Sequence, residues 1–239
     1  MKNKYWNGGG AACIGPLHVR QQLPMQDAHR LYFFYGGFIA VVSDGLGSKA
    51  HSDFGADAAC SAFVKCAKRW VKKGTRSQER FLHYFHSAWI HRIVKSGYCV
   101  EDCAATLLGA VCTRKDLFLF RLGDGMIAFV SADNVNVMSD KKNESFSNIT
   151  DCLKKEHILQ CWEYVKIPPA TVKSVFLCTD GISDDLCFDA LTPFIRDMAA
   201  QYAWYASEQI QADIKQWISQ WSVPRHSDDK TAVFITRRM

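Results

Sequence analysis

Three aspartates share one local pattern, because each precedes a glycine and follows an apolar, strand-like run. Asp44 follows FIAVVS, Asp124 follows LFLFRLG and Asp180 follows SVFLCT. Asp-Gly is a favoured dipeptide of hairpin turns, and the strand-like segment MIAFVSA after Asp124 fits such a turn. Helical patterns follow Asp44 and Asp180 instead, so these two pairs close no hairpin and indicate a chemical role.

Further acids stand beside strand-like segments elsewhere in the chain. Asp27 lies in PMQDAHR, and Asp228 and Asp229 lie in HSDDKTAVFI. The ends of several strands can converge at one edge of a sheet, where gathered carboxylates repel one another unless cations neutralise them. Oxygen ligands without paired His or Cys favour hard cations such as Mg²⁺ or Mn²⁺. The aspartates therefore predict a site for divalent metal ions.

The elements that must position these acids alternate in blocks. Residues 10–42 contain three strand candidates, and helical spacing covers 53–73 and 80–97, with Gly74 as a stop and Ser77 as an N-cap. Short turns join the strand candidates that follow, which predicts antiparallel sheets. The chain then continues with a strand, two helices and a terminal strand: VKSVFLC, FDALTPFIRDMAA, ASEQIQADIKQWISQW and TAVFITR. Two packed sheets flanked by helix pairs would bury one face of every helix.

Composition limits the class of protein. The 239 residues are 48% hydrophobic and 22% charged, which is ordinary for a globular chain. The net charge of +5 fits an anionic or phosphorylated partner but is too small to indicate nucleic acid. The ten cysteines form no CxxC pair, and no segment resembles a signal peptide or reaches the ~18 apolar residues of a membrane span. We expect reduced thiols, a cytoplasmic protein and no membrane partner.

Taken together, the acidic motifs resemble those of the metal-dependent protein phosphatases of type 2C, most closely the compact bacterial forms. The motifs occur in the family's order and are QDA at 26–28, DGLG at 44–47, GDG at 123–125, TDGISD at 179–184 and DDKTA at 228–232. The resemblance implies an α+β fold, a four-layer αββα sandwich with two mainly antiparallel sheets, as a single domain over residues 1–239. It also implies hydrolysis of phosphoserine and phosphothreonine in proteins by a water activated by two metal ions.

The resemblance assigns metal ligands residue by residue. Asp44 would bridge two Mn²⁺ or Mg²⁺ ions, and the Gly45 carbonyl would also bind. Asp180 and Asp228 would hold the first metal. Asp229 stands where many relatives have Asn, so Asp228 is the favoured ligand of the pair.

Further metal ligands are implied at other motifs. Asp27, at the family's first acidic motif, is also a candidate ligand, and Asp124 and Asp184 match the acids that bind a looser third metal in many members. Many relatives carry a phosphate-gripping Arg where this chain has Gln22, and Arg20 is a candidate substitute.

Some relatives place a His directly after the second motif's Asp-Gly, as a proposed general acid. Leu46 stands there in this chain, so His18 and His51 are alternative candidates, and an ordinary loop histidine is the simpler interpretation of each.

Several alternatives stay open. The chain could be a non-catalytic module that binds a partner or phosphorylated segment, or a phosphatase of small phosphomonoesters. We expect a monomer that acts on phosphorylated proteins. Residues 140–165 are interpreted as a surface excursion, and the sequence leaves open whether they form a substrate-selecting flap. The Lys and Arg residues in 65–76, and His83 and His86, are interpreted as solvated helix faces, with docking of acidic substrate segments as the alternative for 65–76.

Overall fold

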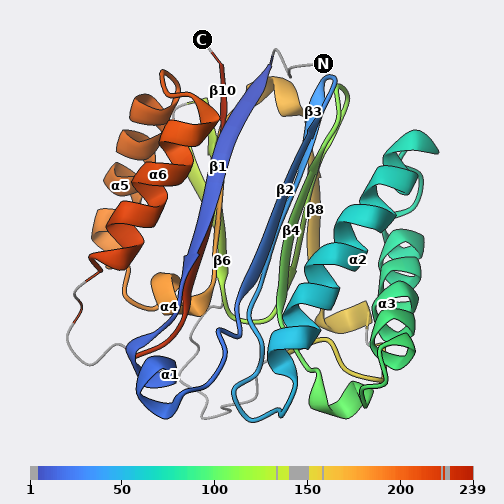
Figure 1. Ribbon diagram of the computed structural model, residues 1–239. Coiled ribbons are helices and arrows are strands. Elements are labelled where there is room, and N and C mark those ends of the chain that lie inside the picture. Colours follow the sequence, from blue (N-terminus) through green and yellow to red (C-terminus); the bar gives the residue numbers. More distant parts are fainter. Residues whose placement is uncertain are drawn as a thin grey trace.

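Two antiparallel sheets stacked face to face form the centre of the molecule, and helix pairs cover both outer faces (Figure 1). The computed structural model describes residues 5–132, 134–139, 151–157, 159–221, 223 and 227–238. All strand pairs between the described elements are antiparallel. The predicted αββα sandwich is confirmed.

Each sheet has five strands. The first contains, in spatial order, β1 (Trp6–Cys13), β10 (Lys230–Arg237), β9 (Val172–Cys178), β6 (Met126–Ser131) and β7 (Asn134–Met138). The second contains β2 (Ala28–Phe34), β3 (Gly37–Ser43), β4 (Leu107–Cys112), β5 (Leu117–Leu122) and β8 (Glu163–Ile167). Short 3₁₀ turns occupy η1 (Val100–Asp102), η2 (Leu159–Cys161) and η3 (Pro169–Thr171).

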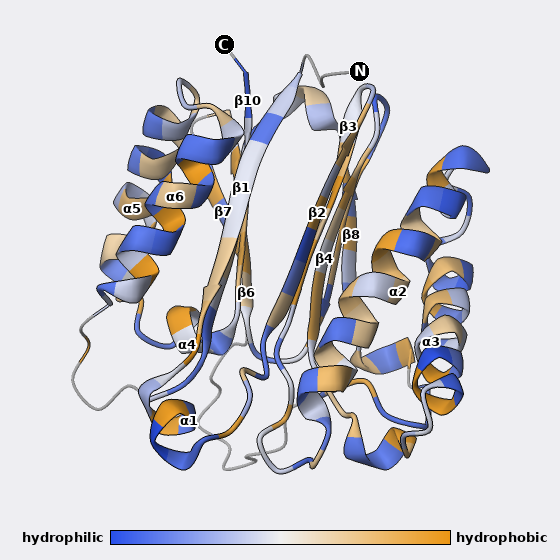
Figure 2. Cartoon of the chain, viewed as in Figure 1, coloured by the Kyte–Doolittle hydropathy of each residue, from blue (hydrophilic) through white to orange (hydrophobic). Residues whose placement is uncertain are grey.

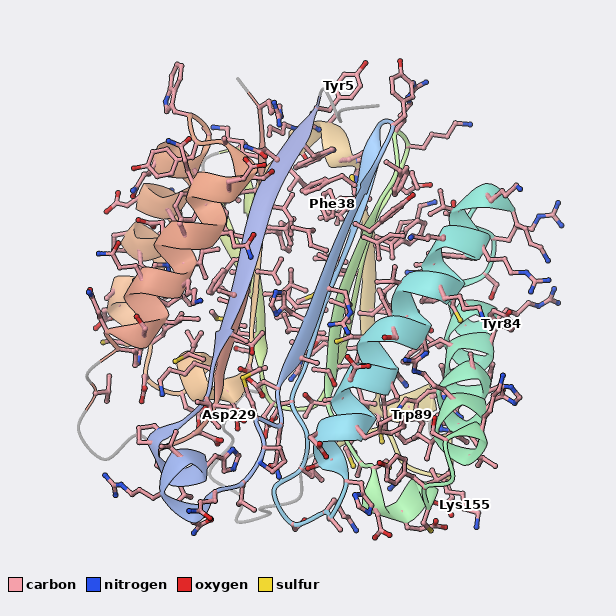
Figure 3. The ribbon with its side chains drawn as sticks, viewed as in Figure 1. Tyr5, Phe38, Tyr84, Trp89, Lys155 and Asp229 are labelled. Carbon is pink, nitrogen blue, oxygen red and sulfur yellow. The ribbon has the colours of Figure 1, made fainter. Side chains whose placement is uncertain are left out.

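Alternation along β3 explains why this strand is apolar throughout. Phe38 and Val42 face the opposite sheet, where they join the core between the sheets, while Ile39 and Val41 face the helices. All of these side chains are fully buried. Because both faces of the strand are covered, the period-two pattern of a half-exposed strand is replaced by a continuous apolar run. Figure 3 shows Phe38 between the two sheets.

The helices form the outer layers. α2 (Ser52–Lys72) and α3 (Gln78–Lys95) cover the second sheet, and α5 (Phe188–Tyr202) and α6 (Ser207–Ser219) cover the first. Apolar colours lie toward the sheets and hydrophilic colours toward the outside of these helices (Figure 2). As predicted, the Ser77 hydroxyl caps α3 by accepting from the Arg80 N–H at 3.2 Å, and Gly74 follows α2 with a φ of 87°.

Two elements differ from the sequence prediction. Residues 16–21 form a short helix, α1 (Pro16–Gln21), where a strand candidate followed by a polar loop was expected. The range 140–165 includes β8 at its end, because Glu163–Ile167 pairs with β5 at the edge of the sheet. Residues 140–150 and 158 of the predicted surface excursion lie outside the described residues.

All ten cysteines are free thiols, and five of them are buried in the cores as small apolar side chains, including Cys60, Cys112 and Cys178. Burial raises the pKa of the Cys66 thiol to about 11. Among the described helices, none combines the length and the apolar composition needed to cross a membrane.

Candidate metal centre

An acidic cleft lies at the end of the sandwich where β3 and β9 end, opposite the chain termini (Figure 1). Its volume is about 290 Å³. Four segments that are far apart in the sequence contribute its acids: the loop after β3, the β5–β6 turn, the start of α4 (Asp180–Ser183) and the segment before β10. The acids that line the cleft are Asp44, Asp124, Asp180 and Asp228.

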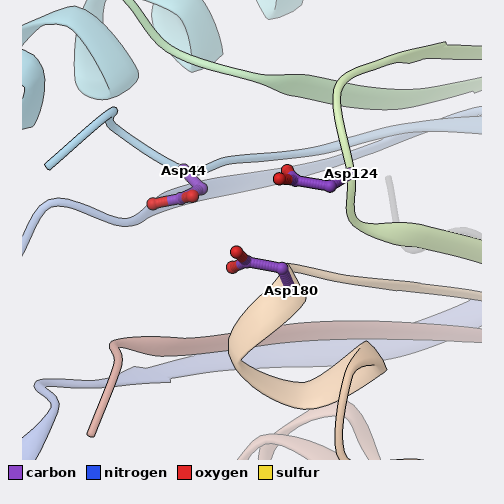
Figure 4. A group of neighbouring side chains, drawn as sticks. All are labelled: Asp44, Asp124 and Asp180. Atoms are coloured by element: carbon purple, nitrogen blue, oxygen red, sulfur yellow. The ribbon is translucent and has the colours of Figure 1, made fainter. Parts of the chain in front are cut away.

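Three of these carboxylates point toward one another (Figure 4). One carboxylate oxygen from each of Asp44, Asp124 and Asp180 lies within 4.8 Å of the others. The structure thus brings together the aspartates of all three Asp-Gly pairs, although 136 positions separate Asp44 from Asp180 along the chain. A single divalent cation placed among such oxygens could contact more than one of them.

Hydrogen bonds fix the position of Asp44. Its backbone N–H donates to the Thr106 hydroxyl at 3.0 Å, and the Thr106 N–H donates back to the Asp44 carbonyl at 2.7 Å. The Gly45 N–H donates to the Gln26 carbonyl at 3.1 Å. A Cβ on Gly45 would lie 2.5 Å from the Ser52 carbonyl oxygen, so only glycine lets the start of α2 approach this closely. The loop is therefore a rigid support for its carboxylate.

Asp180 begins α4, and Thr179 just before it ties three strands together. The Thr179 hydroxyl donates to an Asp27 carboxylate oxygen at 2.8 Å and accepts from the Thr231 N–H at 3.1 Å. The residue after Asp180 must be glycine, because a Cβ at Gly181 would lie 1.9 Å from the Asp229 carbonyl oxygen. The close approach of the β9–α4 and β10 segments places Asp180 beside Asp228 in the cleft.

Burial and mutual repulsion raise the pKa values of the acids in the cleft. The pKa of Asp44 is well above its ordinary value, first because of burial and then because of the charges of Asp27 and Asp180. Burial, followed by the charges of Asp124 and Asp228, raises the pKa of Asp180 to about 7. Burial raises the pKa of Asp27 to about 6. Without a cation the cluster retains protons, which is the behaviour expected of crowded carboxylates with no counter-charge.

The donor set fits hard divalent metal ions. The cleft offers carboxylate oxygens together with backbone at Gly45, and it contains no cysteine. Among the described residues that line it, none is Lys or Arg. Repulsion among crowded, ionised carboxylates is costly, and bound cations would offset it. The cluster is therefore consistent with the expected site for divalent metal ions.

Asp228 and Asp229 have different environments. Asp228 is exposed and lines the cleft, whereas the Asp229 side chain is buried and lies away from it. The Asp229 carboxylate accepts from the Gly15 and Gln26 N–H groups, both at 2.6 Å, and lies 3.0 Å from Nδ1 of His18. Its oxygens are therefore engaged in structural contacts, which leaves Asp228 as the member of the pair available to a ligand.

Four other residues considered from the sequence do not line the cleft. Asp27 is buried behind it, where a hydrogen bond joins its carboxyl group to that of Asp44. Asp184 follows α4 and is exposed outside the residues of the cleft. Arg20 is exposed on α1, although Leu17 and His18 of the same helix do line the cleft. His51 packs its ring against Tyr98 and is also not part of the lining.

Sequence reasoning missed several polar residues of the cleft, namely Gln26, Thr106 and Ser227. Gln26 stands directly before Asp27, and Ser227 directly before Asp228, so proximity to the acidic motifs was a usable signal for both. Thr106 lies in the segment before β4, which carries no acid, and no local pattern distinguishes it.

Comparisons with known proteins agree with this geometry. The family model for protein phosphatase 2C matches residues 14–219. No curated protein matches the sequence. Solved structures with a similar fold include PppA, a key regulatory component of T6SS in Pseudomonas aeruginosa, at a TM-score of 0.65 and 14% identity, over 98% of each chain.

Two further structures are similar over nearly their whole length. A bacterial serine phosphatase has a TM-score of 0.62 and 13% identity, over 97% of each chain. RsbX in complex with magnesium has a TM-score of 0.60 and 12% identity, over 99% of this chain and 98% of RsbX. At such identities the similarity concerns the fold, while the family model covers most of the sequence itself. The chain belongs to the protein phosphatase 2C family.

Proposed function

We propose that this protein is a metal-dependent phosphatase that hydrolyses phosphoserine and phosphothreonine in proteins. The observation that carries the proposal is the convergence of Asp44, Asp124 and Asp180 within 4.8 Å in a cleft whose described lining contains no lysine or arginine. Membership of the family supports the reaction class, and the presence of these acids argues against a module that has lost its catalytic centre.

The acids of the cleft are the proposed ligands. Asp44, Asp180 and Asp228 would hold the catalytic ions, and Asp124 would hold a further ion. The Gly45 carbonyl is the proposed backbone ligand. When bound, Mn²⁺ or Mg²⁺ supplies Lewis-acid chemistry, lowering the pKa of water and offsetting charge on phosphoryl oxygens.

The chain's own side chains position the substrate. The cleft of about 290 Å³ suits a phosphomonoester head group, with Leu17 and Leu46 as apolar wall and Thr106 as a hydrogen-bonding group. His18 is the one basic side chain among the described residues that line the cleft, and its Nδ1 lies 3.0 Å from the Asp229 carboxylate. We propose His18, in place of Arg20, as the group that meets the phosphate. No cysteine lines the cleft, so no thiolate nucleophile is required.

The first experiment measures hydrolysis of p-nitrophenyl phosphate with Mn²⁺. We expect metal-dependent turnover by the wild type and a loss of at least about a hundredfold in Asp44→Asn and Asp180→Asn. Asp197→Asn, which changes an exposed acid on α5, is the matched control and should keep wild-type turnover. Wild-type protein without turnover in either Mn²⁺ or Mg²⁺ would favour the non-catalytic binding module.

The second experiment separates protein substrates from small esters. Phosphoserine and phosphothreonine peptides are compared with p-nitrophenyl phosphate and a sugar phosphate by kcat/KM. The proposal requires the peptides to be the better substrates. A higher kcat/KM for the small esters would support a phosphatase of small phosphomonoesters instead.

A further inference from the structure

Two adjoining hollows form a groove on the outer face of α2 and α3. Their volumes are about 340 and 420 Å³, and Cys66 and Tyr84 line both, so the hollows are continuous. We call this surface the α2–α3 groove. Tyr84, labelled in Figure 3, lies at its centre on the side facing away from the sheets, with 46% of its surface exposed.

The groove carries positive charge along its whole length. Arg69, Lys73, Arg76 and Arg80 line one hollow, and Lys65 and Lys95 line the other. Within the described part of the chain, no Asp or Glu lines either hollow. Such a one-signed surface is unusual for a helix pair, whose exposed faces ordinarily mix both signs. The net charge of the whole chain is only +5, so these cations are concentrated here.

Among the described residues, nearby acids offset only one cation of the groove, Arg92. Asp57 is engaged outside it by Arg30 and lies 3.7 Å from Arg92, which lines the second hollow. Glu79 accepts from the Tyr164 hydroxyl at 3.3 Å on the sheet side of α3. The cations of the first hollow therefore have no carboxylate partner in any ion pair found between described residues.

The floor of the groove is aromatic. Trp70 and Phe81 stack with ring centroids 4.6 Å apart, and Tyr84 accepts a hydrogen bond from Nη1 of Arg69 at 3.0 Å. The indole N–H of Trp70 is buried without a hydrogen-bond partner among the described residues. Protein-binding hot spots are enriched in arginine and in large aromatic side chains. The groove has both, together with an indole N–H that has no partner among the described residues.

The groove is remote from the acidic cleft. Ser52, at the start of α2, packs against Gly45 of the cleft. At a rise of about 1.5 Å per residue, Arg69 lies about 25 Å further along the helix. A ligand in the groove would therefore not occupy the metal centre.

We propose that the α2–α3 groove binds an acidic peptide segment of a partner protein. The two adjoining hollows accommodate a single extended or helical chain. Their Lys and Arg side chains would pair with carboxylates of the peptide, and the aromatic floor would contact its apolar side chains. Nucleic acid and anionic membrane are the competing ligands of a basic surface, but the apolar floor at Trp70 and Phe81 favours a peptide whose acids flank a large apolar residue. This binding is independent of the proposed phosphatase activity.

The test is binding of a short fluorescein-labelled peptide in which Glu residues flank a Leu and a Phe, followed by anisotropy. We expect saturable binding that weakens with added salt, and no binding of the same peptide with Gln in place of Glu. Arg76→Glu combined with Arg80→Glu should weaken binding at least about tenfold. Lys73→Glu combined with Lys95→Glu is a second pair that should do the same.

A charge-matched control distinguishes the groove from net charge. Lys115→Glu combined with Lys215→Glu changes the chain's charge equally, at exposed positions outside the groove, and should keep wild-type affinity. Equal loss in this control would overturn the proposal. The proposal would also be overturned if a labelled oligouridylate, or phosphatidylserine vesicles, bound more tightly than the peptide and the groove variants abolished that binding. Unchanged hydrolysis of p-nitrophenyl phosphate in the groove variants verifies that they fold. If the wild-type protein is inactive, the peptide-binding measurement still tests the groove, because this binding does not depend on phosphatase activity.

Discussion

At the scale of single residues, the contrast between Asp228 and Asp229 is the most informative feature of the centre. Both belong to the same motif, yet one lines the cleft and the other is 2% exposed with two backbone donors on its carboxylate. The Asp229 carboxylate connects the start of α1 and the segment before Asp27 to the beginning of β10. Asp229 is thus a structural residue that holds together the segments carrying the ligands.

Replacing each aspartate by Asn should separate these roles. Asp228→Asn should weaken Mn²⁺ binding at least about tenfold in calorimetry and change the Tm little, because its side chain is exposed. Asp229→Asn places an amide NH₂ against a backbone donor and should lower the free energy of unfolding by about 2–4 kcal/mol. The reverse pattern, with Asp229→Asn losing the metal at unchanged Tm, would show that the assignment is wrong.

The raised pKa of Asp180 predicts a pH dependence of stability. In metal-free protein the folded state keeps this proton up to about pH 7, whereas the unfolded chain loses it near the ordinary value of 3.8. The contribution of Asp180 to stability is therefore present below about pH 4 and is lost as the pH rises to about 7. Asp180→Asn does not titrate and should gain about 4 kcal/mol relative to wild type across this window.

Urea unfolding in EDTA at several pH values measures that difference directly. Comparing variant with wild type cancels the opposite contribution of His157, whose pKa burial lowers to about 4. A difference in unfolding free energy that is flat between pH 4 and pH 7 would mean that Asp180 is not crowded by its neighbours.

At the scale of elements, α2 connects the cleft to the core. Its Gly55 faces the Cys103 backbone so closely that a Cβ would lie 1.9 Å from the carbonyl oxygen, and the Gly55 carbonyl accepts from the Trp89 indole at 3.1 Å. The helix could not pack against the segment before β4 with any side chain at this position.

Gly55→Ala should therefore destabilise the protein by at least about 2 kcal/mol, although alanine is the better helix former. Lys72→Ala, at an exposed position near the end of the same helix, should stay within about 0.5 kcal/mol of wild type. Thermal unfolding followed by circular dichroism compares the two. A stabilising effect of Gly55→Ala would show that propensity outweighs the close contact.

The elements also show what local patterns can and cannot predict. α2 and α3 were predicted because their apolar spacing and their stop and cap residues agree. His86 was interpreted as solvated, but it is 6% exposed and its Nε2 lies 2.7 Å from the Lys154 carbonyl, because residues 151–157 pack over α3. β8 is a short edge strand with half-exposed residues, and its pairing with β5 involves contacts about 46 positions apart that no local pattern reveals.

At the scale of the whole molecule, the acids of the cleft predict strong coupling between metal and stability. Any ion that binds only the folded chain stabilises it, by about 2.7 kcal/mol when its concentration is a hundred times Kd. We expect Mn²⁺ to raise the Tm more at about pH 8 than at about pH 5, because protons compete for the same carboxylates. Differential scanning fluorimetry with Mn²⁺ titrations checks this, with Asp44→Asn as the variant that should lose the shift.

The order of strands within the sheets was not accessible from periodicity alone. Hydrophobic patterns located nine of the strands, but which strand lies beside which depends on contacts between distant segments, such as β1 with β10. The order of the elements predicted two packed sheets flanked by helix pairs, and the Asp-Gly pattern singled out Asp44 and Asp180. The family resemblance implied the αββα sandwich by name and the choice of Asp228 over Asp229. The polar lining from Thr106 and the structural role of Asp229 appear only when the segments are assembled.

The position of β10 has a consequence for biosynthesis. Among the described strands β1 pairs only with β10, which follows it by more than 200 positions, so the ladder of these eight-residue strands cannot form until translation has passed β10. Asp228, just ahead of β10, emerges from the ribosome equally late. A nascent chain that ends before Asp228 therefore has neither a closed first sheet nor a complete set of the proposed metal ligands, and the acidic cleft is complete only after β10 has been made.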